Sequence, residues 1–336
     1  MTFPPPPPAH PPAQRAAEPA VPRTYPQLLR GPGHRWWRPL LSLMVMVGFV
    51  LALVVVAVLA MFAALLAGVD PDLFSDQDAL LAQADQPWFL LANNLLLGAF
   101  IPLSMLAIWI GHGWRPRWVT SVVGGMRWRW LLVTSAVALV VQVVATLALF
   151  SFDGFPSGTG VNVGWLLAVV FLTTPLQAAG EEYLFRGWLT QSVGSWIPAA
   201  LVSALVTAAL ASTLFAMAHG SQNVWLFLDR FAFGVLASYL TWRTGGLEAA
   251  IGAHTVNNVV VFVPTILTGG MASALSVTDV PAWLVLADVA AMVVIGALVV
   301  FLARRTGIQR VYVPEPPPPL PWRDGPPLLV PPRSLG

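Results

Sequence analysis

The chain has 336 residues, of which 57% are hydrophobic and only 10% are charged. A soluble domain carries about 25% charged residues, and the mean hydropathy of this chain is +0.73, so an integral membrane protein is predicted. Cysteine does not occur and the 17 basic residues are all arginine, which excludes disulfides, thiolate metal sites and catalytic cysteine or lysine. The net charge of +2 indicates no nucleic-acid partner, because the arginines lie near segment ends.

The two ends are predicted to be disordered tails. Residues 1–33 contain the run Pro4 to Pro8, and residues 314–336 contain Pro316 to Pro319. Such proline-rich composition cannot bury a core. The N-terminus lacks the basic head and short apolar run of a signal peptide. Partners that bind the polyproline tails, such as SH3-like domains, stay open.

Between the tails, residues 34–313 hold eight apolar runs long enough to cross about 30 Å of hydrocarbon. These runs cover residues 40–68, 87–111, 130–150, 163–193, 197–218, 223–243, 247–267 and 283–303. The predicted fold is therefore all-α, a polytopic bundle of about eight transmembrane helices with the lipid bilayer as its first partner.

Charge asymmetry predicts the orientation of the bundle. Arginines cluster before the first run, between the second and third, and after the last, whereas aspartates fill the opposite loops. Both termini are therefore expected to be cytoplasmic in a multi-pass plasma-membrane protein. Residues 115–130, where arginines alternate with tryptophans, are expected to form an amphipathic helix flat on that surface.

Three charged residues interrupt the fourth run. Each of Glu181, Glu182 and Arg186 would cost about 2.5 to 3.5 kcal/mol at the bilayer centre, so they imply pairing, a wet cavity or chemistry. Glu182 and Arg186 are four residues apart and can pair on one helix face. Glu181 points about 100° away, which leaves one carboxylate available as a general base.

Two histidines lie in later runs at helical spacing from a partner. Phe215 precedes His219 by four residues, and His254 precedes Asn258 by four. With Glu181 as the base and His219 sharing the attacking water, His254 and Asn258 would supply oxyanion donors for hydrolysis of an amide bond. The alternative is an interhelical hydrogen-bond network that only holds the bundle together.

These residues resemble the motifs of the CPBP intramembrane proteases, which include the CaaX prenyl endopeptidases and bacterial Abi-type relatives linked to bacteriocin maturation or self-immunity. Residues 181–186 fit E-E-x-x-x-R, residues 215–219 fit F-x-x-x-H and residues 254–258 fit H-x-x-x-N. The resemblance covers about residues 163–265. It implies a membrane-embedded endopeptidase acting on membrane-associated peptide or protein substrates, with Glu181, Glu182, His219, His254 and Asn258 catalytic, and Arg186 and Phe215 in support.

Metal dependence is a further expectation. If zinc is bound, the ligands would be Glu181, His219 and His254, and Glu182 would be the base. Glu182 would then not be available to pair with Arg186. The H-E-x-x-H spacing is missing, and the resembled family has been described both as metalloproteases and as glutamate-type peptidases. The metal-free version is preferred here.

Two other functions stay open for the same polar residues. A proton- or ion-coupled transporter would use buried acids and histidines as an ion path, although no internal repeat is visible. A catalytically inactive scaffold would use the tails to recruit partners. Asp229, Arg230 and Asp288 in later runs, and Asn93 and Asn94 in the second, are expected to pair between helices, and His112 is expected at the membrane interface.

Overall fold

The computed structural model describes residues 21–314, and within them eight helices are long and apolar enough to cross a membrane. The spans are α1 (Arg38–Leu66), α4 with α5 (Pro87–Gly98 and Phe100–His112), α6 (Trp128–Asp153), α7 (Val163–Glu182) with the π-helix η3 (Tyr183–Leu189) and α8 (Thr190–Gly194), α9 (Ala200–Met217), α10 (Val224–Thr244), α11 (Glu248–Thr268) and α13 (Ala282–Arg305). The all-α, eight-span prediction is confirmed, and the chain is a multi-pass membrane protein.

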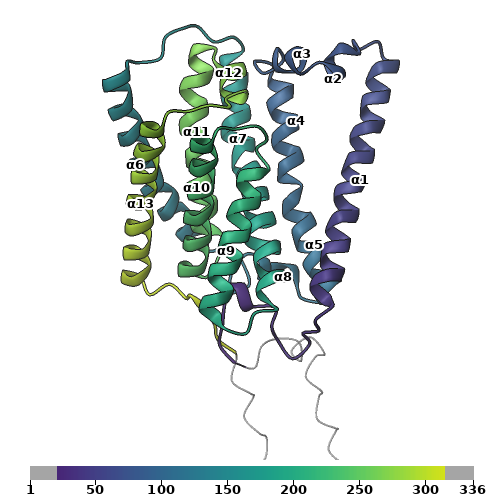
Figure 1. The fold of residues 1–336 in the computed structure, drawn as a ribbon, viewed down its shortest axis with the longest axis vertical. Coiled ribbons are helices and arrows are strands. Elements are labelled where there is room, and N and C mark those ends of the chain that lie inside the picture. Colours follow the sequence, from purple (N-terminus) through teal and green to yellow (C-terminus); the bar gives the residue numbers. More distant parts are fainter. Residues whose placement is uncertain (1–20, 315–336) are drawn as a thin grey trace, which may run out of the picture.

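Short elements connect the spans and close the ends. Near the N-terminus they are β1 (Arg23–Thr24) and η1 (Tyr25–Gln27), and the loops contain α2 (Asp72–Ser75), α3 (Gln77–Leu81), η2 (Pro116–Val119) and α12 (Met271–Leu275). After α13, β2 (Val311–Tyr312) pairs antiparallel with β1, so the two ends of the described chain meet on one side of the bundle (Figure 1).

The span that carries the two adjacent glutamates lies at the centre of the bundle. It packs against α4 on one side and α11 on the other, and α11 packs in turn on α6. In Figure 1, α1 and α4 lie to one side of α7, and α6 and α13 to the other. The most apolar window of α1 has a mean hydropathy of 3.1 and none of it is buried, whereas 44% of the α7–α8 window is buried at a hydropathy of 1.5. Apart from its contacts, which are chiefly with α5, α1 therefore faces outward, toward lipid, whereas protein surrounds the glutamates.

The structure corrects the predicted boundary of the N-terminal tail at residue 33. Tyr25 and Leu28 are fully buried, and the Tyr25 hydroxyl donates a hydrogen bond to the Val119 carbonyl. Gln27 Nε2 donates to the Ile197 carbonyl at 2.9 Å. Large apolar side chains after residue 24 give this stretch a surface to bury despite the prolines before it. The remainder of both predicted tails lies outside the described residues.

The surface helix expected at residues 115–130 is also wrong. Before α6 begins at Trp128, only the short η2 forms there, and Ser121 then makes an antiparallel bridge with Gly246. Arg127, the residue before α6, binds Glu248 at the start of α11 through its backbone N–H at 3.0 Å, Nε at 2.8 Å and Nη2 at 2.6 Å. Arg127 thus fixes the start of α6 against the start of α11.

Of the five polar residues expected to pair between helices, Asn94, Asp229 and Asp288 do so, whereas Asn93 bonds its neighbour Asn94 at 3.5 Å and Arg230 donates to Gln222, in the loop before α10, at 2.6 Å. Asn94 Nδ2 on α4 donates to Thr173 Oγ1 at 2.9 Å and to Thr174 Oγ1 at 3.2 Å on α7. Asp229 on α10 and Asp288 on α13 share a hydrogen bond. His112 lies at the end of α5, where protein covers it and leaves it 1% exposed.

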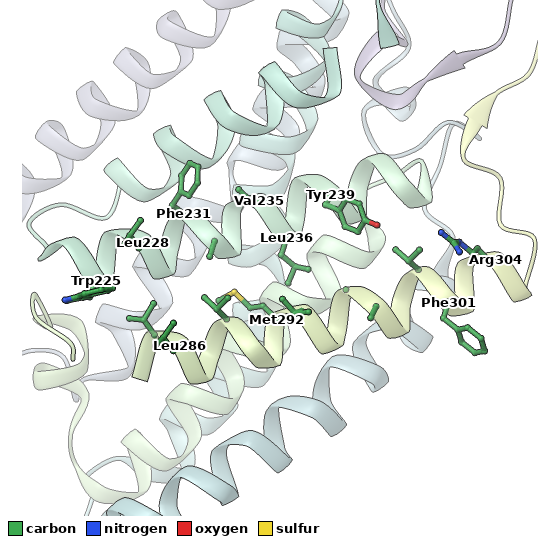
Figure 2. A pocket seen from close by; sticks show the side chains of 17 residues that line it. Trp225, Leu228, Phe231, Val235, Leu236, Tyr239, Leu286, Met292, Phe301 and Arg304 are labelled. Carbon is green, nitrogen blue, oxygen red and sulfur yellow. The ribbon is translucent and has the colours of Figure 1, made fainter. Parts of the chain in front are cut away.

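An apolar groove runs between α10 and α13, with a volume of about 890 Å³. Figure 2 shows Trp225 near one end, Arg304 near the other, and Leu236 and Met292 between them. Its walls are almost entirely hydrocarbon, as expected for a surface that faces acyl chains. The polar cluster described below lies outside its lining residues.

Because α7 packs closely against the junction of α4 and α5, adding one methyl group at Gly180 is expected to lower the stability of the protein. A Cβ at Gly180, beside Glu181, would overlap the Leu97 carbonyl and the Gly98 backbone. We expect Gly180→Ala to destabilise the protein by about 1 to 3 kcal/mol, the usual cost of overpacking. A Cβ at Gly164, on the same helix, would meet no atom within 4 Å, so Gly164→Ala is the matched control. Unfolding in mixed detergent micelles measures both, and equal stability of the two variants would contradict this packing.

Candidate active site

The two glutamates sit where α-helix changes to π-helix. α7 ends at Glu182, and the next seven residues form η3, the π-helix Tyr183–Leu189. π-Turns are rare and often occur at functional sites. The whole span is 32 residues long, which is about 48 Å at 1.5 Å per residue and exceeds the roughly 30 Å hydrocarbon core. This length lets the glutamates lie deep in the bundle although they are near the C-terminal part of the span.

Glu182 is the centre of a buried charge cluster. Its Oε1 accepts from Arg186 Nη1 at 2.9 Å and from His254 Nδ1 at 2.8 Å. Glu182 and Arg186 are both fully buried, and His254 is 4% exposed. The predicted spacing of four residues therefore produces a pair, and the structure adds His254 to it. Because Nδ1 faces a carboxylate, it carries a proton, and Nε2 is the nitrogen that remains for chemistry.

Glu181 points away from this cluster and is held by amides. Gln177, one turn earlier on α7, donates from Nε2 to Glu181 Oε1. Asn258 on α11 donates from Nδ2 to Gln177 Oε1 at 2.9 Å. The other Glu181 oxygen, Oε2, lies 3.9 Å from His254 Nε2. This distance is too long for a direct hydrogen bond and suits a water molecule in contact with both atoms.

Ring contacts bring the F-x-x-x-H motif, Phe215 and His219, next to His254 and Arg186. The Phe215 ring on α9 lies 4.7 Å from the His219 ring and 5.7 Å from the His254 ring, measured between centroids. The Arg186 guanidinium lies 4.5 Å from the Phe215 centroid, within the range of a cation–π contact. Phe215 thus fills the space between the histidines and the buried arginine.

His219 occupies the exposed edge of the cluster, two residues beyond the end of α9. Its Nδ1 lies 2.7 Å from the Phe215 carbonyl oxygen, so Nδ1–H donates and Nε2 is left as an acceptor. The Glu181 charge acts on this ring. Of the seven residues expected at the site, His219 is therefore the one that approaches from outside, while the other six form the interior.

The ligand set expected for zinc is not assembled. Within residues 21–314 no three His, Cys, Asp or Glu side chains gather closely enough to hold a metal ion. His254 directs Nδ1 to Glu182, and Glu181 Oε1 is taken by Gln177. The side chains as placed therefore do not fit a zinc ion.

Sequence reasoning did not single out Gln177, Phe233, Asn257 or Gln142 as parts of this site. The Phe233 ring on α10 lies 4.9 Å from the His254 ring. Gln142 Nε2 on α6 donates to Asn257 Oδ1 at 3.3 Å, and Asn257 Nδ2 donates to Asn258 Oδ1 at 3.3 Å. Gln177 carried a usable signal, because it precedes Glu181 by four residues on an otherwise apolar helix. Phe233 carried none among so many apolar residues.

The fold and the site thus define a polytopic membrane protein with two glutamates, a histidine and an asparagine gathered inside the bundle and a second histidine at its edge. In a comparison with protein families, residues 163–260 match the family of Rce1-like type II CAAX prenyl endopeptidases. All three motifs fall inside the matched segment. The resemblance to CPBP and CaaX proteases is thereby confirmed for it.

A curated relative matches a segment of similar length. "Uncharacterized protein YyaK" of Bacillus subtilis (strain 168) is 35% identical over 98 residues, which is 28% of this chain and 32% of the relative. The chain thus covers about a third of that relative's length, and the relative's name assigns no activity. No solved structure matches the chain.

Proposed function

We propose that this protein is an intramembrane endopeptidase that hydrolyses peptide bonds of membrane-associated proteins or peptides with water activated by Glu181. The observation that carries the proposal is the gap of 3.9 Å between Glu181 Oε2 and His254 Nε2, between two groups whose other polar atoms are already bonded. A water in contact with both has a base on one side and an imidazole on the other. The match to the CAAX endopeptidase family over residues 163–260 supports this reaction class.

The proposed reaction follows from which atoms are free. Glu181 Oε2 takes a proton from water as the oxygen attacks the carbonyl carbon, and it returns that proton to the leaving amine. His219, whose Nε2 is an acceptor, shares the water from the exposed edge. His254 stabilises the oxyanion through Nε2–H, which requires the doubly protonated ring because Nδ1–H already faces Glu182. The second Nδ2 hydrogen of Asn258 completes the oxyanion site.

The decisive test is a peptidase screen of the purified protein in liposomes, with a library of quenched fluorescent peptides and proteins anchored in the same membrane. Wild type is compared with Glu181→Ala, with and without a chelator. Cleavage that disappears in Glu181→Ala supports the proposal. Cleavage that is equal in both proteins would assign the activity to a contaminant or to another residue.

Metal content separates the two mechanisms. We expect purified, active wild type to contain no stoichiometric zinc, because Glu181, His219 and His254 do not form a metal-binding group. Elemental analysis of wild type and of the three single alanine variants measures it, and Asn258→Ala is the control, because Asn258 is not among the expected ligands. Stoichiometric zinc that is lost in those three variants and kept in Asn258→Ala would overturn the metal-free mechanism.

A further inference from the structure

Gln177 bonds both the proposed base, Glu181, and one of the two proposed oxyanion donors, Asn258. Its Oε1 accepts from Asn258 Nδ2 at 2.9 Å, and its Nε2 donates to Glu181 Oε1. Gln177 is 6% exposed, so neither half of its amide can exchange a partner for bulk water without opening the bundle. An amide has one donor end and one acceptor end, so the two contacts fix its orientation.

Three more side-chain amides continue this series of hydrogen bonds away from Glu181. Gln142 donates to Asn257, Asn257 donates to Asn258, and Asn258 donates to Gln177. Gln142 also bonds the Asp288 carboxylate, which can only accept while ionised. Gln142 on α6 thus donates both to Asp288 and to Asn257, and Asn257, Asn258 and Gln177 each accept with the amide oxygen and donate onward with the amide nitrogen. The final donor in this series faces Glu181.

This directionality distinguishes the two oxygens of Glu181. Oε1 accepts from Gln177, so it is held as a lone-pair oxygen. Oε2 is left facing His254 Nε2 across 3.9 Å. Without the amide of Gln177, the Glu181 side chain could rotate and offer either oxygen, or neither, to the water between it and His254.

We propose that Gln177 is a positioning residue for peptide hydrolysis, which selects Glu181 Oε2 as the base and couples its orientation to that of Asn258. This assignment rests on the proposed function. It places a residue outside the three motifs in the reaction, one helical turn before the first of them. Displacement of a reacting group by about 1 Å can cost 10²-fold in rate. Loss of the hydrogen bond between Gln177 and Glu181 is therefore expected to lower the rate strongly, although Gln177 touches no substrate.

Kinetics test the positioning role. Gln177→Met keeps the length of the side chain and removes both hydrogen bonds, and we expect kcat to fall about 10²-fold with KM little changed, because the lost alignment acts in the transition state. Thr174→Val, which removes a buried hydrogen bond to Asn94 from the same helix, is the matched control and should keep its kcat.

Infrared spectroscopy tests the contact without any substrate. Gln177→Glu puts a second carboxyl group against Glu181, and two carboxyl groups in contact hold a proton between them. We expect Gln177→Glu to show a protonated-carboxyl band at neutral pH in addition to that of the Asp229–Asp288 pair, and Gln177→Met to lack this added band. It should vanish in Gln177→Glu combined with Glu181→Gln, where carboxylate and amide exchange places.

The two readouts have separate meanings. A new band together with a selective fall in kcat supports the assignment. Absence of the band, or wild-type kcat in Gln177→Met, overturns it. A wild type that cleaves nothing would contradict the proposed peptidase function, whereas the band would still decide whether Gln177 holds Glu181.

Discussion

Glu181→Gln is expected to abolish proteolysis while leaving the fold intact. Glutamine keeps the volume of the side chain, and its carbonyl oxygen can still accept from Gln177, but it cannot take a proton from water. Because general-base catalysis contributes about 10² to 10⁴-fold, turnover should fall to or below the detection limit of a fluorescent peptide assay. Glu181 is 8% exposed, so the change removes a partly buried charge and is not expected to lower stability.

Two comparisons make this result specific to Glu181. Thermal unfolding of wild type and Glu181→Gln in the same detergent checks that the fold is kept. The equivalent change at Glu182 should instead reduce the yield of folded protein, because Glu182 is the partner of Arg186 and His254. Full activity in Glu181→Gln would remove Glu181 from its role and pass the base assignment to Glu182.

The eight spans could be predicted from the sequence because one rule on backbone hydrogen bonding in lipid decides them. Every backbone polar group inside lipid must be bonded internally, so each long apolar run has to be a helix. The run predicted at residues 163–193 is observed as Val163–Gly194, and the run at 223–243 as Val224–Thr244. The same rule says nothing about segments at the interface, which is where the predictions for residues 21–33 and 115–130 were wrong. Those segments pack by contacts that are distant in sequence, such as Tyr25 with Val119.

The polar residues of the site could be selected from sequence because charges are rare in membrane helices and each demands a partner. Their pairing could not be derived in full. Helical spacing predicted the contact of Glu182 with Arg186, but His254 joins them from a different helix. Likewise Asn258 was expected beside His254 as a donor, and its bond to Gln177, through one of its two Nδ2 hydrogens, could not be foreseen. A period of 3.6 residues places side chains on a face, and only the packing of α7 against α11 decides which faces meet.

The charge cluster around Glu182 leads to the largest expected effect on stability. Arg186 is fully buried, and Glu182 is its hydrogen-bond partner, while its Nε and Nη2 have none among the described residues. Glu182→Gln would leave the guanidinium with an uncharged partner and the Phe215 ring. Breaking a buried ion pair by removing one partner costs about 3 to 5 kcal/mol. We expect this loss in Glu182→Gln, and a similar one in Arg186→Met, as a lower free energy of unfolding in detergent and a lower yield of folded protein.

The double variant Glu182→Gln with Arg186→Met should recover part of the loss, because replacing a whole buried ion pair with groups of similar volume is often neutral. His254 limits the recovery, since its Nδ1–H then donates to an amide oxygen instead of a carboxylate. Arg304→Met is the control for removing an arginine, because Arg304 is exposed at the end of α13 and its loss should change stability by less than about 0.5 kcal/mol. If both single variants and the double variant were as stable as wild type, Glu182 and Arg186 would not be an energetic pair, and the buried charge at Arg186 would have to be stabilised by the aromatic rings around it.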